Sequence, residues 1–335
     1  MTQMHLEASQ AAEIVTRQLS ANASLMAGLA TRLKALNPSI IFTCARGSSD
    51  HAATYAKYLF ETRLRIPTLS QAPSLSSIYG GALLHMKDVP FILISQSGRS
   101  PDLLLSAEAA KAAGALVIAF VNDINSPLAG LAEIVVPLHA GAETSVAATK
   151  SYIATLAALA HLTAMWSGDE TMADAVEVLP NTLAQAWNAD WSAGVDLFEQ
   201  ASSLFVLGRG TTLGIAQEAA LKLKETCGIH GEAFSVAEVA HGPMALVKDG
   251  FPVLIFPPLD QASLGLDKIV ALFETRGAHI ALVGAANFPI PVNMHPTIAP
   301  IAMIQSFYRL VNALAVRRGY DPDHPPMLNK VTQTR

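Results

Sequence analysis

Residues 95–102 read Ser-Gln-Ser-Gly-Arg-Ser-Pro-Asp and directly follow the apolar run 90–94. This pattern predicts a buried strand that ends in a polar turn, after which a helix begins with Ser100 as N-cap and Pro101 in its first position. Such a turn gathers hydroxyls, backbone N–H groups and the positive end of a helix, which together suit a phosphate. An ordinary capped turn has the same sequence features. Asp102 would repel a phosphate if it faced the turn, or would simply stabilise the helix end.

A second group of polar residues has helical spacing. Glu218, Lys222 and Glu225 follow one another at intervals of four and three residues, which places two carboxylates and an ammonium on one face of a helix. A carboxylate base beside a cation is what proton transfer next to a carbonyl group requires. The same spacing also fits a solvated stripe held by a salt bridge.

Two histidines follow this helix in the sequence. His241 precedes Gly242 and Pro243, so we expect it on a turn from which its imidazole can project into a cleft. We interpret His230 as a core or interface residue. The arrangement of these histidines with Glu232 and Glu238 does not match a zinc pattern, so no metal site is predicted.

The chain contains an internal repeat, because three stretches recur in the same order. The first copies are residues 46–49, 90–94 and 114–119, and the second copies are residues 209–212, 252–256 and 277–282. Continuous apolar runs between helix-forming segments are typical of parallel strands covered on both faces. The sequence therefore predicts an α/β protein with two tandem doubly wound domains, each a parallel sheet flanked by helices.

The repeat also predicts where the elements lie. We expect strands at about 39–44, 68–71, 91–95, 116–121, 134–138, 204–208, 253–256 and 279–283, with weaker candidates near 233 and 297. The predicted organisation is an N-terminal helical segment 1–36, with one helix from Met4 to about Leu36, a first domain 37–168, a second domain 189–318 and a non-helical tail 319–335. In the second copy, residues 257–260 read Pro-Pro-Leu-Asp, so only the first copy keeps the hydroxyls for a phosphate.

The composition excludes several classes of protein. The chain has 335 residues, of which 51% are hydrophobic and 15% charged, with a net charge of −5 and no basic cluster, so no nucleic-acid partner is expected. The longest apolar stretch, residues 153–166, is too short to span a bilayer, and the N-terminus lacks the layout of a secretory signal. Two cysteines, Cys44 and Cys227, cannot form a disulfide framework. We expect a soluble cytoplasmic protein.

These motifs, together with residues 142–150 and the tail segment Asn329-Lys330-Val331-Thr332, occur in an order that resembles the tandem sugar isomerase (SIS) domain family. The resemblance covers nearly the whole chain and is closest to the isomerase half of glucosamine-6-phosphate synthase and to SIS-type glucosamine-6-phosphate deaminases. It implies that Val146 and Ala147 line a sugar pocket. It also implies a set of contacts to the sugar phosphate from Ser48, Ser49, Ser95, Gln96, Ser97 and Ser100.

The resemblance also implies catalytic roles. Glu225 would be the base that moves a proton between C1 and C2, and Lys222 would stabilise the enolic intermediate. His241 would open the sugar ring, reaching across a dimer interface into the neighbouring site, and Lys330 would lie at the carbonyl carbon. The implied protein is a homodimer with a shared active site and no cofactor, because the chemistry is proton transfer.

The chain departs from the synthase pattern in three respects. Arg46 stands where the synthase has a cysteine, Ala148 stands where it has a serine, and the first copy lies almost at the start of the sequence, without a glutaminase domain before it. We therefore expect a deaminase that converts glucosamine 6-phosphate and water to fructose 6-phosphate and ammonia. The alternatives are a fructosamine-6-phosphate deglycase, another hexose-phosphate aldose–ketose isomerase and a non-catalytic sugar-phosphate sensor.

Overall fold

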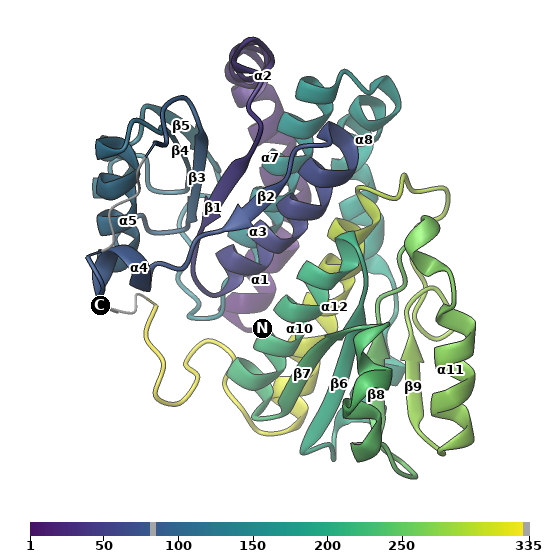
Figure 1. Cartoon of the computed structure of the whole chain (residues 1–335). Helices are drawn as coiled ribbons and strands as arrows, with labels where there is room; N and C mark the ends of the chain where they lie inside the picture. Colours follow the sequence, from purple (N-terminus) through teal and green to yellow (C-terminus); the bar gives the residue numbers. More distant parts are fainter. Residues whose placement is uncertain (81–84, 331–335) are drawn as a thin grey trace. The chain divides into compact units, whose positions relative to one another are not determined.

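The computed structural model describes residues 1–80 and 85–330, so Val331 and Thr332 of the predicted tail motif lie outside the described residues. The chain contains two compact units, each built on its own parallel sheet (Figure 1). We call them the β1–β5 unit and the β6–β9 unit. The first comprises Glu13–Glu143, Lys150–Glu177 and the chain from Asn329, and the second comprises Met1–Ala12, Thr144–Thr149 and Val178–Leu328.

The β1–β5 unit has a five-stranded parallel sheet with the order β2-β1-β3-β4-β5. Its strands are β1 (Ile41–Cys44), β2 (Thr68–Ser70), β3 (Pro90–Ser95), β4 (Leu116–Val121) and β5 (Ile134–Pro137). The chain runs outward in one direction from β1 to β2 and in the other from β3 to β5. Cys44 pairs with Leu93, so the carboxyl ends of β1 and β3 lie side by side. Ligands of open α/β sheets bind at this kind of switch point.

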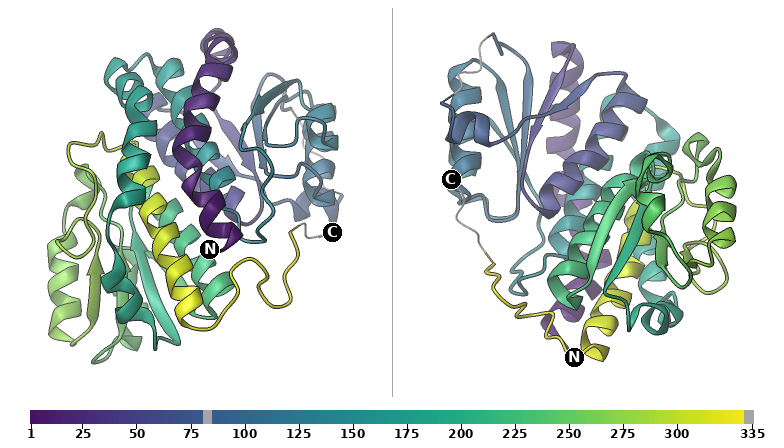
Figure 2. Two further views of the ribbon diagram at one scale, coloured as in Figure 1. Left: turned by 180° about the vertical axis from the view of Figure 1, so that it is seen from behind. Right: turned by 60° about the horizontal axis from the view of Figure 1, so that its bottom comes forward.

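Helices cover both faces of this sheet (Figures 1 and 2). On one face α5 and α6 pack over a core that includes Phe91, Leu93 and Val117, and α3 and α7 lie on the other. The helical segments of the unit are α2 (Ala11–Leu36), α3 (Ser48–Leu59), the π-helical η1 (Phe60–Leu64), α4 (Ser74–Ser77), α5 (Pro101–Ala112), α6 (Pro127–Leu131), α7 (Lys150–Ser167) and the first part of α8 (Glu170–Asn188). Helix α7 is apolar around most of its circumference, which fits its burial.

The β6–β9 unit repeats this plan with a four-stranded parallel sheet in the order β7-β6-β8-β9. Its strands are β6 (Ser203–Gly208), β7 (His230–Ser235), β8 (Pro252–Ile255) and β9 (His279–Leu282). Helices α10 and α12 pack on one face and α11 on the other, above a core that includes Phe205 and Phe273 (Figure 2). The helical segments are α1 (Gln3–Ser9), α9 (Ser192–Phe198), α10 (Thr211–Cys227), η2 (Glu238–His241), η3 (Pro243–Leu246), η4 (Gln261–Ser263), α11 (Leu266–Thr275) and α12 (Ala299–Arg317).

The predicted duplication is confirmed in the backbone as well as in the strand order. Gly47 precedes α3 with φ 54° and ψ −133°, and Gly210 precedes α10 with φ 62° and ψ −133°. Only glycine adopts this conformation readily, because it has no Cβ. The two Arg-Gly turns are therefore the same structure, formed twice.

Two of the expected elements need correction. The prediction of a single N-terminal helix is wrong, because α1 ends at Ser9 and α2 begins at Ala11, with Gln10 in a turn between them. The strand near 297 is also wrong, since Thr297 lies in the turn before α12, whereas β7 confirms the strand near 233. Helix α12 is long and apolar enough to cross a membrane by composition, but 83% of it is buried inside the protein, as in an ordinary core helix.

Candidate functional site

The predicted phosphate-binding serines of the β1–β5 unit gather at its switch point. Ser48 and Ser49 form the first turn of α3, directly after β1. Ser95 is the last residue of β3, and Ser100 is the N-cap residue of α5. Because β1 and β3 are neighbours, the two loops that carry these hydroxyls lie at one place on the sheet edge.

The loop after β3 is held in one shape by a hydrogen bond within it and by one from α6. The Gly98 N–H donates to Ser95 Oγ at 3.0 Å, and the Leu128 N–H donates to the Gly98 carbonyl at 3.2 Å. Gly98 has φ 62°, and a Cβ there would lie 2.1 Å from Ser126 Oγ. The loop therefore needs glycine, and Gln96 and Ser97 are presented at a tight, half-buried turn.

Gln71 is a polar residue at the same edge that the sequence did not reveal. Its N–H donates to the Thr43 carbonyl at 2.7 Å, so it lies beside the end of β1. The side chain is buried, and its Nε2 atom has no hydrogen-bond partner among the residues that the structure describes. A buried amide donor of this kind calls for a polar partner such as a water or a ligand. Nothing in the local sequence distinguishes it from a surface glutamine.

The acid–base residues of the β6–β9 unit form a compact cluster on α10. Lys222 Nζ lies 2.6 Å from Glu225 Oε2 and 3.2 Å from Glu218 Oε1, and the Tyr308 hydroxyl of α12 donates to Glu218 Oε1 at 3.2 Å. Lys222 is 1% exposed and Glu218 is fully buried, whereas the Glu225 side chain keeps 21% of its surface. The alternative of a solvated stripe is therefore wrong. Glu225 is the member of this trio that a reactant could reach.

Lys222 remains an ammonium in this cluster. Burial alone would lower its pKa, but the nearby carboxylates of Glu218 and Glu225 and their hydrogen bonds outweigh burial, so the pKa of Lys222 is raised. A fixed positive charge beside a partly exposed carboxylate can stabilise an oxyanion while the carboxylate exchanges a proton.

The two histidines occupy exposed positions. His241 ends the short helix η2, just before Gly242, which confirms its expected place on a turn. His230 begins β7 and is also exposed, so the core alternative is wrong and the interface alternative stays a prediction. No group of three or more His, Cys, Asp or Glu side chains within residues 1–80 and 85–330 could hold a metal ion.

The predicted sugar-pocket segment, Thr144–Thr149, is fixed by a carboxylate that sequence analysis missed. Glu7 of α1 is fully buried, and its Oε1 accepts from the Thr144 N–H at 2.6 Å and its Oε2 from the Ser145 N–H at 3.2 Å. The Val146 N–H donates to the Asp323 carbonyl at 3.4 Å, and Ala147 is fully buried.

The Asp323 carboxylate also caps α1, accepting from the N–H groups of Gln3 and Met4 at 2.7 Å each. The N-terminal helix and the chain after α12 thus hold one loop. Sequence spacing offered a signal, because Glu7 falls on the same helical face as the buried residues Met4 and Ala8.

Lys330 makes its contact within the β1–β5 unit. Its Nζ lies 3.2 Å from Glu143 Oε2, and the Glu143 side chain is fully buried. Glu143 also accepts from the Ser151 N–H at 3.1 Å and the Ser151 hydroxyl at 2.6 Å, in the first turn of α7. The lysine is therefore held by a carboxylate that is itself fixed to a helix.

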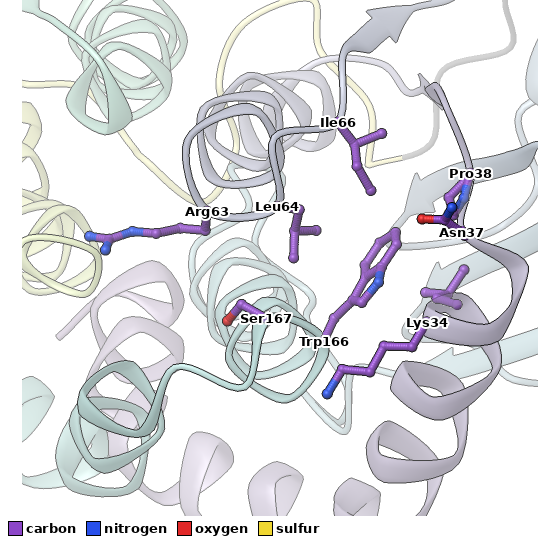
Figure 3. A pocket seen from close by; sticks show the side chains of 9 residues that line it. Lys34, Asn37, Pro38, Arg63, Leu64, Ile66, Trp166 and Ser167 are labelled. Carbon is purple, nitrogen blue, oxygen red and sulfur yellow. The ribbon is translucent and has the colours of Figure 1, made fainter.

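A pocket of about 280 Å³ in the same unit is separate from the predicted site residues (Figure 3). The side chains of Leu64, Ile66 and Trp166 converge on it, and Pro38 and Ile66 precede β1 and β2. It lies at the amino ends of these strands, and none of the predicted site residues lines it.

Comparison with known proteins agrees with the fold. The model of the SIS domain matches residues 37–165 and 197–316, one match in each sheet-bearing part of the chain. The chain therefore belongs to the SIS domain family.

Individual relatives make the likeness more specific. A candidate phosphosugar isomerase from Silicibacter pomeroyi has 40% identity and a TM-score of 0.90, with 96% of this chain and all of that chain covered. The glutamine–fructose-6-phosphate aminotransferase (isomerizing) of Sulfurisphaera tokodaii is 30% identical over 305 residues, which are 88% of this chain. The match covers 50% of that relative, so the chain spans about half its length. The glucosamine-6-phosphate deaminase of Thermotoga maritima, at 23% identity, shares the fold with a TM-score of 0.82 over 99% of this chain and all of that chain.

Proposed function

We propose that the protein is an amino-sugar phosphate deaminase that converts glucosamine 6-phosphate and water to fructose 6-phosphate and ammonia. The observation that carries this proposal is the partly exposed Glu225 carboxylate, 2.6 Å from the buried Lys222 ammonium. The family supports a sugar-phosphate isomerase type of reaction. One relative is named for fructose 6-phosphate, and another is described as a phosphosugar isomerase. A protein described as a glucosamine-6-phosphate deaminase has the same fold, which supports the proposal.

The proposal assigns the binding of the phosphate to the two loops of the β1–β5 unit. Ser48, Ser49, Ser95, Ser97 and Ser100 supply hydroxyl donors, and Gln96 lies between two of them. The first turns of α3 and α5 add N–H groups and the positive ends of two helices. The phosphate is attached to C6, whereas the reaction takes place at C1 and C2. Losing one hydrogen-bond donor to the phosphate should therefore raise KM more than it lowers kcat.

The proposal assigns the chemistry to α10 and the residues that follow it. His241 opens the ring, and the backbone of Val146 and Ala147 lines the sugar. Glu225 removes the C2 proton of the open aldehyde and returns a proton to C1, while Lys222 stabilises the enolic oxygen. The product of this step is a ketose imine at C2. Water adds to C2 and the nitrogen leaves as ammonia, so the atoms balance; Lys330 is assigned to the carbonyl end of the substrate.

An isomerase that needs no amino group is the second candidate, because the same proton transfer interconverts aldose and ketose phosphates and the Sulfurisphaera tokodaii relative is named as isomerizing.

We also propose that the active protein is a cytoplasmic homodimer in which His241 serves the partner's site. Sedimentation of the active protein would give a dimer mass, and a catalytically competent monomer would exclude this arrangement.

The deciding experiment is an assay of the purified chain with a panel of sugar phosphates. Glucosamine 6-phosphate should release ammonia and fructose 6-phosphate in equal amounts, while unphosphorylated glucosamine should not react. Ammonia or free amine from fructosamine 6-phosphates alone would identify a deglycase, and interconversion of neutral sugar phosphates without ammonia would identify an isomerase. Binding of these compounds without any turnover would favour the sensor.

A further inference from the structure

Arg46 and Asp102 form an ion pair that joins the two loops of the switch point. Arg46 Nε and Nη2 lie 2.8 Å and 2.7 Å from Asp102 Oδ2, and Asp102 Oδ1 accepts from the Leu103 N–H at 2.8 Å. The Asp102 side chain is fully buried, whereas 47% of the Arg46 side chain is exposed. The buried Asp102 carboxylate thus fixes one side of the Arg46 guanidinium, and the other side of the guanidinium is exposed to solvent.

The place of the pair explains how Asp102 can occupy an anion-binding loop. Asp102 is the second residue of α5, where its charge would cancel the attraction of the helix end for a phosphate. Its carboxylate faces Arg46 instead, so the guanidinium neutralises it. Arg46 itself immediately precedes Gly47, the N-cap residue of α3. The cation therefore lies between the starts of the two helices that the proposed phosphate site uses.

We propose that Arg46 binds the substrate phosphate directly, with Asp102 as the residue that orients it. This inference rests on the proposed function. A guanidinium has five N–H donors in a planar fork. The bonds to Asp102 use two of them, which leaves the open side of the fork for phosphate oxygens. Arginine suits such bidentate recognition, and a charge-assisted bond is about twice as strong as a neutral one.

The second repeat supplies a matched control. Arg209 holds the same place before Gly210 and α10, but its Nη1 donates to the backbone carbonyl of Leu264 at 3.1 Å. It has the same sequence context and charge, and its contact is a neutral carbonyl rather than a buried carboxylate. Arg209→Gln changes the net charge of the protein by the same amount as Arg46→Gln, and Arg209 lies in the loop of the other sheet.

The experiment measures binding of inorganic phosphate and of glucosamine 6-phosphate to the full chain by calorimetry. Arg46→Gln alone removes the positive charge that faces the buried Asp102 carboxylate, which can cost stability. The double variant Arg46→Gln/Asp102→Asn removes both charges and keeps a hydrogen-bonding pair. We expect this double variant to bind both compounds about 10- to 100-fold more weakly, the effect of losing a charge-assisted group. Arg209→Gln should bind both compounds as the wild-type protein does.

The double variant separates the two roles of Arg46. If Arg46 only neutralises Asp102, removing both charges restores wild-type affinity, and the inference is overturned. Arg46→Lys keeps the pair and the charge but not the fork, so a smaller loss is expected, and wild-type phosphate affinity in both Arg46→Lys and the double variant would refute direct binding.

The same data distinguish this inference from the proposed reaction. Phosphate binding that depends on Arg46 in a protein that releases no ammonia would leave the inference standing and remove the deaminase. Ammonia release with phosphate binding unaffected in the double variant would do the reverse.

Discussion

The two sheets share a strand order but differ at the edge where ligands of such sheets bind. At the β1–β3 edge, serine hydroxyls and an arginine supported by a buried carboxylate follow the strands. At the β6–β8 edge, Thr212 takes the place of Ser49 and its hydroxyl donates to the Phe256 carbonyl at 2.8 Å. At the β6–β8 edge, a hydrogen bond within the protein thus joins the two loops that follow the strands. The second copy uses its hydroxyl to hold its loops together, whereas the proposed function assigns the hydroxyls of the first copy to a phosphate.

The divergence extends to the helices that follow the first strand of each copy. In the β6–β9 unit, α10 carries the buried Glu218 and Lys222 and the accessible Glu225. The corresponding α3 begins with the serines of the proposed phosphate site, and its buried residues are Tyr55, Leu59 and three alanines. The duplicated units therefore carry different polar groups on similar frameworks. The proposed function assigns phosphate binding to the first unit and proton transfer to the second, so we expect mutations to alter the two separately.

The largest expected effect tests the assignment of chemistry to the second copy. Glu225→Gln keeps the shape of the side chain and its contact with Lys222 but removes the base. We expect kcat to fall about 10²- to 10⁴-fold with little change in substrate binding, as for the loss of a positioned acid–base group. Steady-state ammonia release and calorimetric binding would measure the two quantities. Glu232→Gln, an exposed position on β7, is the control and should keep wild-type turnover; full turnover by Glu225→Gln would break the comparison.

A smaller effect tests why the first copy keeps a glycine in its loop. At the corresponding place the second copy has Asp260 with φ −132°, which any residue adopts, whereas Gly98 has φ 62°. Gly98→Ala would place a methyl group against Ser126 Oγ in a left-handed backbone conformation. We expect the free energy of unfolding to fall by about 1–3 kcal/mol and phosphate affinity to weaken. Gly130→Ala in α6, where a Cβ meets no atom within 4 Å, is the control for denaturant unfolding; equal stability of the two variants would contradict this account.

The smallest effect compares the buried thiol of each copy. Burial raises the pKa of Cys44 to about 12 and that of Cys227 to about 11. A raised pKa means less thiolate at a given pH, so iodoacetamide should label neither thiol of the native protein appreciably at about pH 8. As the pH rises, Cys227 should react before Cys44. In the unfolded chain both thiols ionise first, so their contribution to stability is lost as the pH rises from about 9 through these values. Mass spectrometry of labelled peptides would check the order, and rapid labelling of Cys44 at neutral pH would contradict it.

The local sequence was sufficient to predict the positions of most strands and helices. The apolar runs predicted every strand except β7 within one or two residues, because continuous burial leaves a continuous hydrophobic pattern. For β7, which is only partly buried, the pattern predicted a position near 233 without bounds. The order Ser-Pro-Asp predicted the start of α5 with Ser100 as N-cap residue. The strand expected near 297 failed because a short apolar stretch before a buried helix has the same composition as a strand. The N-terminal helix broke at Gln10, where no glycine or proline gives a signal.

The sequence by itself determined the repeat, the strand and helix positions and the spacing that puts Glu218, Lys222 and Glu225 on one face, because these depend on neighbours a few residues away. Only the tertiary structure decided which charges are buried and what they contact. Arg46 meets Asp102 across 56 residues, and Glu7 meets Thr144 across 137. A carboxylate can be buried only where packing brings donors to it, and no local pattern records which distant segment supplies them.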